Sequence, residues 1–255
     1  MPLESPMDSI QIYLITAAIF LLGGAVKGTV GFGLPLVSIT LLTPFYGLVD
    51  AIGLMVIPAV VTNFWQALTG GNFGISWRRL WTLYVFGAVV TAISATMLLQ
   101  IHSRWPMALL GAVIVVYSIS GLAAWRYRPP GEKERWLSPL MGISTGFFTG
   151  LTGVLVFPMT IYLKSLKLDR SMMIQAMGIY LVLANLTVAS VFGWQGAFPK
   201  ETSVVAVIGV GAGLIGMVVG RWIQKRLSDL IFERAFYLVL GSVGLFIILK
   251  ALISE

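Results

Sequence analysis

A single lysine lies inside a long apolar stretch near the start of this chain. Residues 10–45 carry no charge except Lys27, which stands in the glycine-rich run GGAVKGTVGFGLP. An ionised lysine near the bilayer centre costs about 2.5 to 3.5 kcal/mol on insertion scales, so its presence needs a reason. Lys27 could be the counter-charge of an anionic substrate, or its long side chain could reach the membrane interface. We favour the first interpretation.

Amide side chains in other apolar stretches could complete such a site. Asn63 and Asn185 lie deep in uncharged segments, where they could donate hydrogen bonds to a substrate or join two helices. Gln66 and Gln175 are weaker candidates of the same kind. All four amides could therefore serve binding or helix packing, and we favour binding for the asparagine pair.

A second glycine-rich run, GISTGFFTGLTGVLVFP, is similar to the first. Thr149 takes the place of Lys27 in this run, so the charge is not duplicated, and Thr149 and Thr152 could donate hydroxyl groups instead. Glycine allows a ligand to approach the main chain closely. The glycines that we expect to contact the substrate are Gly28, Gly31, Gly33, Gly150 and Gly153.

Residues that could do other chemistry are scarce. The chain has no cysteine and a single histidine, His102, which lies near Arg104 in a short connector. All ten carboxylates lie at the chain ends or in connectors, so no acid–base pair and no proton relay is expected inside the membrane. The sequence therefore predicts no catalytic residue, no metal site and no cofactor.

The composition indicates that the chain is surrounded by a medium other than water. The chain is 58% hydrophobic and 11% charged, with a mean hydropathy of +0.92, whereas soluble domains are about a quarter charged. A lipid bilayer is the solvent that fits this composition. The net charge of +7 does not indicate nucleic-acid binding, because no basic stretch alternates with stacking aromatic residues. Excess lysine and arginine marks the cytoplasmic loops of a membrane protein.

The chain divides into two similar halves. Adding 122 to a position pairs Gly24/Gly146, Gly28/Gly150, Gly31/Gly153, Asn63/Asn185, Gly71/Gly193 and Gly87/Gly209. Glycine and proline are the two worst helix formers, so each glycine-rich segment is expected to form two shorter helices. We predict an all-α polytopic membrane protein with one repeat over 1–125, a linker over 126–136 and a second repeat over 137–255.

The distribution of lysine and arginine selects the topology. If each glycine-rich segment crosses the membrane once, the positive residues divide evenly between the two sides. If the segments 10–45 and 137–163 are hairpins, three positive residues lie on one side and thirteen on the other. The usual asymmetry of membrane proteins favours hairpins. The repeats are then inverted, each a hairpin plus three transmembrane helices, with eight to ten segments, a cytoplasmic linker and extracytoplasmic termini.

Matching broken segments in inverted halves indicate a binding site near the membrane midplane. Half-helices that end there present unpaired N–H groups and the positive end of the helix dipole. Both features attract anions, which agrees with the favoured role of Lys27.

The segments GGAVKGTVGFGLPLVSITLL and STGFFTGLTGVLVFPMTIYL resemble the paired repeats of the sulfite exporter TauE/SafE family. The resemblance covers essentially the whole chain. The family's glycine-rich stretch ending in proline matches Gly24, Gly28, Gly31, Gly33 and Pro35, then Gly146, Gly150, Gly153 and Pro158. In the second copy Leu155 stands where the first has Gly33. The resemblance implies transport of sulfur-containing anions such as sulfite, thiosulfate or sulfonates, or of other organic anions, across the inner membrane.

These observations predict a secondary transporter that moves a small anion by alternating access. An anion channel or uniporter is the alternative within transport, and an enzyme embedded in the membrane is a less favoured one. Anion transport follows from Lys27 and the half-helices, whereas the choice of sulfur rests on the resemblance alone. The expected partners are the anion and the lipid bilayer, and the sequence leaves the oligomeric state open.

Overall fold

The computed structural model describes residues 9–68, 71–101, 104–123, 129–154, 157–224 and 229–253, and every regular element in these ranges is helical. His102 and the chain ends lie outside the described residues. The elements are α1 (Ser9–Val30), α2 (Leu34–Tyr46), α3 (Leu48–Leu68), α4 (Phe73–Gln100), α5 (Trp105–Leu122), the 3₁₀ turn η1 (Gly131–Lys133), α6 (Glu134–Thr152), α7 (Met159–Ser165), α8 (Arg170–Trp194), α9 (Thr202–Gln224) and α10 (Asp229–Ile253).

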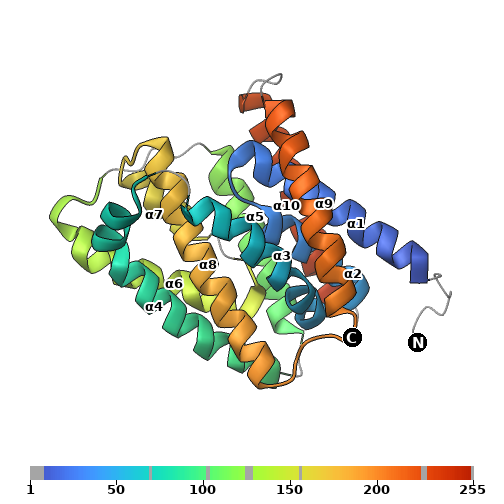
Figure 1. Cartoon of the computed structure of the whole chain (residues 1–255). Helices are drawn as coiled ribbons and strands as arrows, with labels where there is room; N and C mark the ends of the chain where they lie inside the picture. The colour runs from blue at the N-terminus through green and yellow to red at the C-terminus, as the bar shows by residue number, and fades with distance from the viewer. Residues whose placement is uncertain are drawn as a thin grey trace.

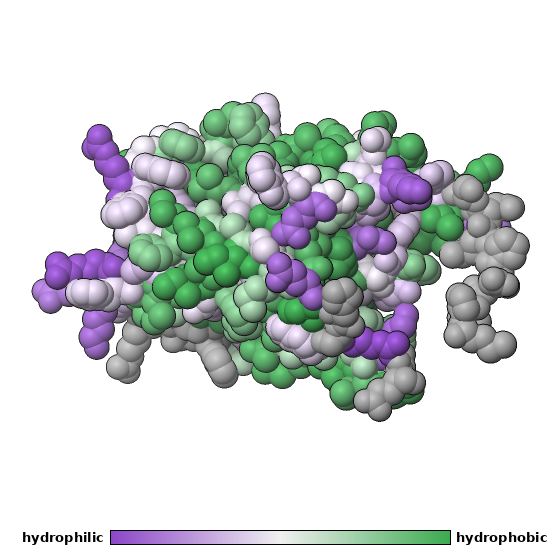
Figure 2. Space-filling model, turned by 90° about the horizontal axis from the view of Figure 1, so that it is seen from below, coloured by the Kyte–Doolittle hydropathy of each residue, from purple (hydrophilic) through white to green (hydrophobic). Residues whose placement is uncertain are grey.

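The helices confirm the prediction of an all-α polytopic membrane protein. Within the described residues, seven helices are long and apolar enough to cross a membrane: α1, α3, α4, α5, α8, α9 and α10. Many large apolar side chains on their outer surfaces are exposed, Val207 and Val218 among them. Figure 2 shows one face on which hydrophobic residues cover broad areas and hydrophilic residues gather in a few patches. Lipid chains can cover such a surface, which water would not solvate.

Helices of the first half pack against helices of the second half. α1 lies along α9, α4 along α6, α3 along α8 and α5 along α10. Figure 1 shows α1 and α9 on one side of the molecule and α4 and α6 on the other. If α1–α5 exchange places with α6–α10, the pair α1/α9 becomes the pair α6/α4, and the other two pairs map onto themselves.

The close contacts made by the glycines repeat with the same offset of 122. The corresponding pairs are Gly24 against Gly213 and Gly146 against Thr91, Gly28 against Met217 and Gly150 against Ala95, Gly31 against Ile174 and Gly153 against Ile52, and Gly209 against Pro58 and Gly87 against Tyr180. Each of these contacts joins the two halves. Adding or subtracting 122 converts each contact into another contact that is also present.

The equivalent helices α3 and α8 run antiparallel. The side-chain amide of Gln66, near the end of α3, donates to Ile174 O near the start of α8 at 2.9 Å. At the other end, a Cβ placed on Gly53 of α3 would lie 2.8 Å from Pro199, just beyond α8. Two equivalent helices of opposite direction are what an inverted repeat requires.

The first glycine-rich segment is a broken helix, as the sequence predicted. α1 ends at Val30, and Gly31 and Gly33 have φ angles of +89° and +117°, which residues with a Cβ rarely adopt. α2 then turns back along α1, so that Tyr46 OH lies 2.9 Å from Thr16 Oγ1. The segment 10–45 therefore forms a hairpin whose two limbs are joined at their open end by a hydroxyl pair.

The second glycine-rich segment is broken as well, but its limbs are unequal. α6 begins at Glu134, three residues before the expected start, and ends at Gly153, whose φ is +71°. The returning helix α7 has only seven residues. Tyr162 OH on α7 lies 2.8 Å from Ser138 Oγ on α6, the counterpart of the pair formed by Tyr46 in the first hairpin.

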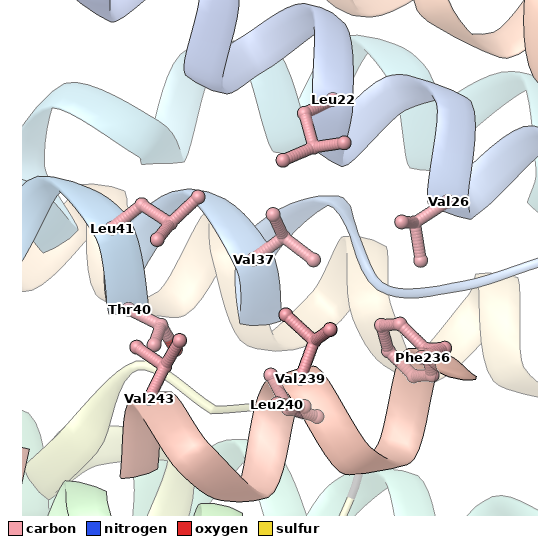
Figure 3. A pocket seen from close by; sticks show the side chains of 9 residues that line it. All are labelled: Leu22, Val26, Val37, Thr40, Leu41, Phe236, Val239, Leu240 and Val243. Atoms are coloured by element: carbon pink, nitrogen blue, oxygen red, sulfur yellow. The ribbon is translucent and has the colours of Figure 1, made fainter. Parts of the chain in front are cut away.

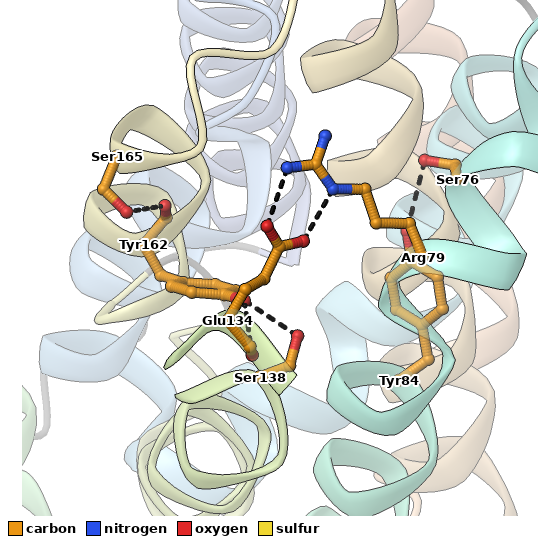
Figure 4. Close-up of polar contacts among 7 residues, drawn as sticks. All are labelled: Ser76, Arg79, Tyr84, Glu134, Ser138, Tyr162 and Ser165. Carbon is orange, nitrogen blue, oxygen red and sulfur yellow. Dashed lines mark hydrogen bonds and ion pairs between the residues drawn. The ribbon is translucent and has the colours of Figure 1, made fainter. Parts of the chain in front are cut away.

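An ion pair holds the start of α6 against α4. Arg79 donates from Nε and Nη2 to the two carboxylate oxygens of Glu134 at 2.6 and 2.8 Å. Figure 4 shows this pair beside the contact of Tyr162 with Ser138. Two parallel hydrogen bonds fix the orientation of a guanidinium better than a single bond does. The pair thus fastens one half of the protein to the other near the beginning of the second hairpin.

Candidate functional site

Lys27 lies in the last turn of α1 and is buried, with 2% of its surface exposed. Its side chain does not extend to the surface but turns towards α3. There its Nζ donates to Thr62 Oγ1 at 3.1 Å and to Asn63 Oδ1. An ammonium group carries three N–H donors, so these two contacts leave one N–H for a further acceptor.

No carboxylate of the described residues neutralises Lys27. Among the described residues, the ion pair that the structure shows joins Arg79 on α4 to Glu134 on α6. A buried charge without a counter-ion is costly, because the interior solvates it poorly. The environment of Lys27 therefore favours the binding of an anion.

Asn63 contributes a second donor beside Lys27. Its Oδ1 accepts from the lysine, while its Nδ2 is fully buried and has no hydrogen-bond partner in the structure. An unpaired buried donor costs about 1 to 3 kcal/mol. An anionic oxygen close to Lys27 could accept from both groups. A hydrogen bond from Asn63 to a substrate stays a prediction.

The proline in α3 helps to hold Thr62 in place. Pro58 lies inside the helix, and its carbonyl oxygen accepts a hydrogen bond from Thr62 Oγ1 at 2.9 Å. Because this bond uses the hydroxyl proton of Thr62, the oxygen is available as an acceptor for Lys27. Thr62 thus helps to orient the ammonium group of Lys27 from α3, and it does so with an uncharged side chain.

A cavity of about 240 Å³ opens beside Lys27, between the ends of α1, α3 and α9 and the start of α8. Its lining combines two cations, two amides and backbone at the helix break. The residues that line it are Lys27, Gly28, Thr29, Gly31, Trp65, Gln66, Ile174, Met217, Arg221 and Gln224. This composition suits a small, polar, negatively charged ligand.

The glycines expected to contact the substrate have packing roles in the structure. Gly28 lines the cavity, and a Cβ there would overlap the carbonyl oxygen of Met217 on α9. A Cβ on Gly150 would likewise overlap Ser94 on α4. Gly31 lines the cavity, whereas Gly33 lies against Val26 on α1. Their contact with a substrate stays a prediction.

Gln66 and Gln175 join α3 to α8 by hydrogen bonds. Gln66 donates to Ile174 O, and Gln175 Nε2 donates to Ala67 O at 3.0 Å. The backbone N–H of Asn72 in turn donates to Gln175 Oε1 at 2.7 Å. Gln66 also lines the cavity, so of these two amides it is the one placed to meet a ligand.

The second hairpin places its candidates away from the Lys27 cavity. Thr149 Oγ1 lies 3.4 Å from both Val154 O and Tyr180 OH, and Thr152 Oγ1 donates to Phe148 O at 2.6 Å. Gly153 ends α6 and packs against Ile52. These hydroxyl groups are used within the hairpin and its neighbours, and a role in binding remains a prediction.

Asn185 differs from its counterpart Asn63 in its hydrogen bonding. Its Nδ2 donates at 2.6 Å to Leu181 O, one turn earlier in α8. The amide therefore bonds to its own helix and does not reach the lysine. The offset of 122 identifies the two asparagines as equivalent in position, but their bonding is not the same.

The sequence analysis did not identify Thr62, Arg221 or Gln224 as part of a site. A signal for Thr62 was present, because it adjoins Asn63 in an apolar helix. Arg221 was counted among the cytoplasmic positive residues on charge alone, and no sequence pattern singles out Gln224 at the end of α9. Only the packing of α9 against α1 places them beside Lys27.

A second cavity has unsuitable chemistry for an anion. It lies between α1, α2 and α10 and is lined by apolar side chains and one threonine, including Val37, Thr40 and Phe236 (Figure 3). No charged group faces it. Among the described residues there is also no cluster of histidine, aspartate or glutamate that could hold a metal ion. Two further cavities near the start of α6 have glutamates as well as basic residues in their linings. The cavity at Lys27 combines a buried cation with a lining that has no carboxylate, so we take it as the candidate site.

Comparison with known families assigns the chain to one of them. The family model described as "Sulfite exporter TauE/SafE" matches residues 15–247. The chain belongs to this family. It is accordingly a multi-pass membrane protein of a transporter family, and the match includes all or most of each hairpin and of each of the seven long apolar helices. No match was found among curated proteins or among solved structures.

Proposed function

We propose that this protein is a secondary transporter that moves sulfite, or a related organosulfur or organic anion, across the inner membrane. The observation that carries the proposal is the buried ammonium group of Lys27, which has no carboxylate partner among the described residues and borders a cavity. Family membership supports the choice of sulfite and related anions.

The site can bind an oxyanion through three kinds of interaction. The remaining N–H of Lys27 and the unpaired Nδ2 of Asn63 can each donate to an anionic oxygen. Thr29 and Gln66 on the cavity wall offer further polar groups. Hydrogen bonds to a charged group contribute about 1.5 to 3 kcal/mol each, so two of them suffice for a reversible site.

Alternating access is supported by the relation between the two halves. The glycine contacts repeat with an offset of 122, and the equivalent helices α3 and α8 run antiparallel. Two inverted repeats, over 1–125 and 137–255, can rock against each other about a site near their interface. The cavity beside Lys27 opens towards the ends of α1, α3 and α9, whereas Tyr46 and Thr16 close the first hairpin at its opposite end.

The proposed topology places the cavity opening on the cytoplasmic side. Arg221 and Gln224 stand at the end of α9, next to the positive residues that the charge distribution assigns to the cytoplasm. Both chain ends then lie outside the cytoplasm. A reporter fused to the C-terminus that is active only outside the cytoplasm tests this orientation.

Substrate counterflow in proteoliposomes tests the function. Vesicles preloaded with unlabelled sulfite should accumulate radiolabelled sulfite in a saturable manner, and methanesulfonate should compete for uptake. An anion channel would conduct the label without this accumulation against the gradient. Absence of exchange and conductance for both anions, in protein that elutes as a single monodisperse peak, would contradict the proposal.

A further inference from the structure

Arg221 lines the same cavity as Lys27 although the two residues lie in different halves of the chain. It is exposed and occupies the last turn of α9, whereas Lys27 is buried in the last turn of α1. One cation therefore stands at the opening of the cavity and the other at its inner end. No carboxylate is present in the lining between them.

The packing of α9 against α1 fixes Arg221 relative to Lys27. Gly28 follows Lys27 directly and meets the carbonyl of Met217, and Gly220 meets Ala25 one turn further along α9. Both contacts are so close that a Cβ would overlap the facing backbone. Arg221 lies one helical turn, about 6 Å, beyond Met217. Its side chain is thus held at the cavity by the same glycines that join the two helices.

Neither cation is duplicated in the other half of the protein. The offset of 122 pairs Lys27 with Thr149 and Arg221 with Leu99. If Arg221 served only to mark the cytoplasmic side, no particular position on α9 would be required of it. Its occurrence at the one cavity that holds a buried lysine indicates a role together with that lysine.

We propose that Arg221 is a second anion-binding residue, which captures the oxyanion at the cavity opening before the anion reaches Lys27. This inference rests on the proposed function of the cavity. A guanidinium group presents a planar fork of donors that matches two oxygens of a sulfite, sulfonate or carboxylate group. Lysine presents a compact charge instead, and Thr62 and Asn63 already occupy two of its donors at the buried end of the cavity.

The two cations then act at different stages of binding. Arg221 determines how readily an anion enters from the end where α9 finishes, and Lys27 determines whether the anion is held inside. Loss of the first should raise the concentration needed for half-maximal exchange. Loss of the second should remove saturable exchange altogether.

Counterflow of radiolabelled sulfite in four variants tests this division. Arg221→Gln should raise the half-saturation concentration about tenfold, as expected for one lost charge-assisted contact, and change the maximal rate less than about twofold. Arg221→Lys keeps the charge but not the fork, so its half-saturation concentration should fall between those of the wild type and Arg221→Gln. Lys27→Met should show no saturable exchange.

Arg234→Gln is the matched control. Arg234 is exposed near the start of α10, which follows α9 closely in the chain, and it does not line the cavity. Its replacement removes the same charge and should leave both kinetic constants within about twofold of the wild type, because exposed charges act weakly at a distance in salt.

The outcomes separate this inference from the function on which it rests. If Arg221→Gln behaves like Arg234→Gln while Lys27→Met loses exchange, Arg221 is not an anion-binding residue, although the transport function stands. If wild-type protein shows no saturable exchange, the proposed function fails and this inference fails with it. If Lys27→Met exchanges normally, Lys27 does not bind the anion and this inference fails, although the transport function stands.

Discussion

The two glycine-rich hairpins share a framework but differ in the chemistry at their breaks. In the first hairpin, Lys27 donates to Thr62 and Asn63 beside an open cavity. In the second, Thr149 occupies the equivalent position, and the nearby Asn185 bonds only to its own helix. Several of the close glycine contacts around the breaks nevertheless recur at equivalent positions in the two halves.

This difference indicates that the residues that pack the helices together are distinct from the residues that could bind a ligand. Glycines at matching positions allow α1 to approach α9 and α6 to approach α4, so they define the framework in both halves. The buried charge of Lys27 and the unpaired amide of Asn63 have no equivalent at the matching positions of the second half, where Thr149 and Asn185 stand. In the function proposed above, the single substrate site includes the break of the first hairpin, and we propose that the second hairpin is its partner in movement.

The strongest test of the comparison exchanges the residues at the two equivalent positions for apolar ones. Lys27→Met should lower the efficiency of sulfite counterflow at least about 100-fold, because the charge and its hydrogen bond to the anion are lost together. Thr149→Val should lower it less than about threefold, since the hydroxyl has weak contacts at 3.4 Å. Equal losses in the two variants would contradict a site that belongs to the first hairpin.

Substitution of Asn63 and of its counterpart Asn185 should also have unequal effects on sulfite counterflow, smaller than those at Lys27 and Thr149. Asn63→Ala should raise the half-saturation concentration about tenfold, because it removes both an acceptor of Lys27 and the free Nδ2 donor. Asn185→Ala should change it less than about twofold, because that amide bonds to Leu181 O. Counterflow titrations of both variants measure the ratio, and a larger effect at Asn185 would reverse the assignment.

Because the two hairpins pack in equivalent ways, substitutions at equivalent glycines should lower the stability of the protein by similar amounts. Gly28→Ala and Gly150→Ala should each lower the free energy of unfolding by about 1 to 3 kcal/mol, because the added Cβ overlaps the facing helix. Thermal unfolding of detergent-solubilised protein measures the change. Gly211→Ala on α9 is the control, since a Cβ there meets nothing within 4 Å. Stability losses confined to one half would argue against equivalent packing.

The hydroxyl pairs that close the two hairpins should give the smallest effects. Tyr46→Phe removes the hydrogen bond to Thr16. Tyr162→Phe removes the bond to Ser138 at 2.8 Å and a longer one to Glu134 O at 3.5 Å. A hydrogen bond of this kind contributes about 0.5 to 1.5 kcal/mol to stability. Thermal unfolding should show similar small decreases for both variants. A loss of several kcal/mol in either one would mean that its tyrosine does more than close the hairpin.

Much of the fold could be predicted from the sequence, because helix breaks and close helix packing both require glycine. The offset of 122 and the breaks at Gly31, Gly33 and Gly153 were visible as spacing alone. The shortness of α7 could not be predicted, since residues 137–163 carry no charge and the length of the uncharged run does not reveal where a helix resumes.

The site was predictable only in part. Lys27 and Asn63 stood out because a charge and an amide are rare in apolar segments. Their contact with each other, and with Thr62, depends on how α1 packs against α3, which no local pattern records. The same limit explains why Gln66 and Gln175 could not be told apart from ligand-binding amides, although they join α3 to α8.

Equilibrium binding of radiolabelled sulfite to the purified protein tests the central claim most directly. We expect one saturable site per chain in the wild type, one in Thr149→Val and none in Lys27→Met, with all three proteins monodisperse. Two sites per chain in the wild type, or unchanged binding in Lys27→Met, would contradict a single anion site built on the first hairpin.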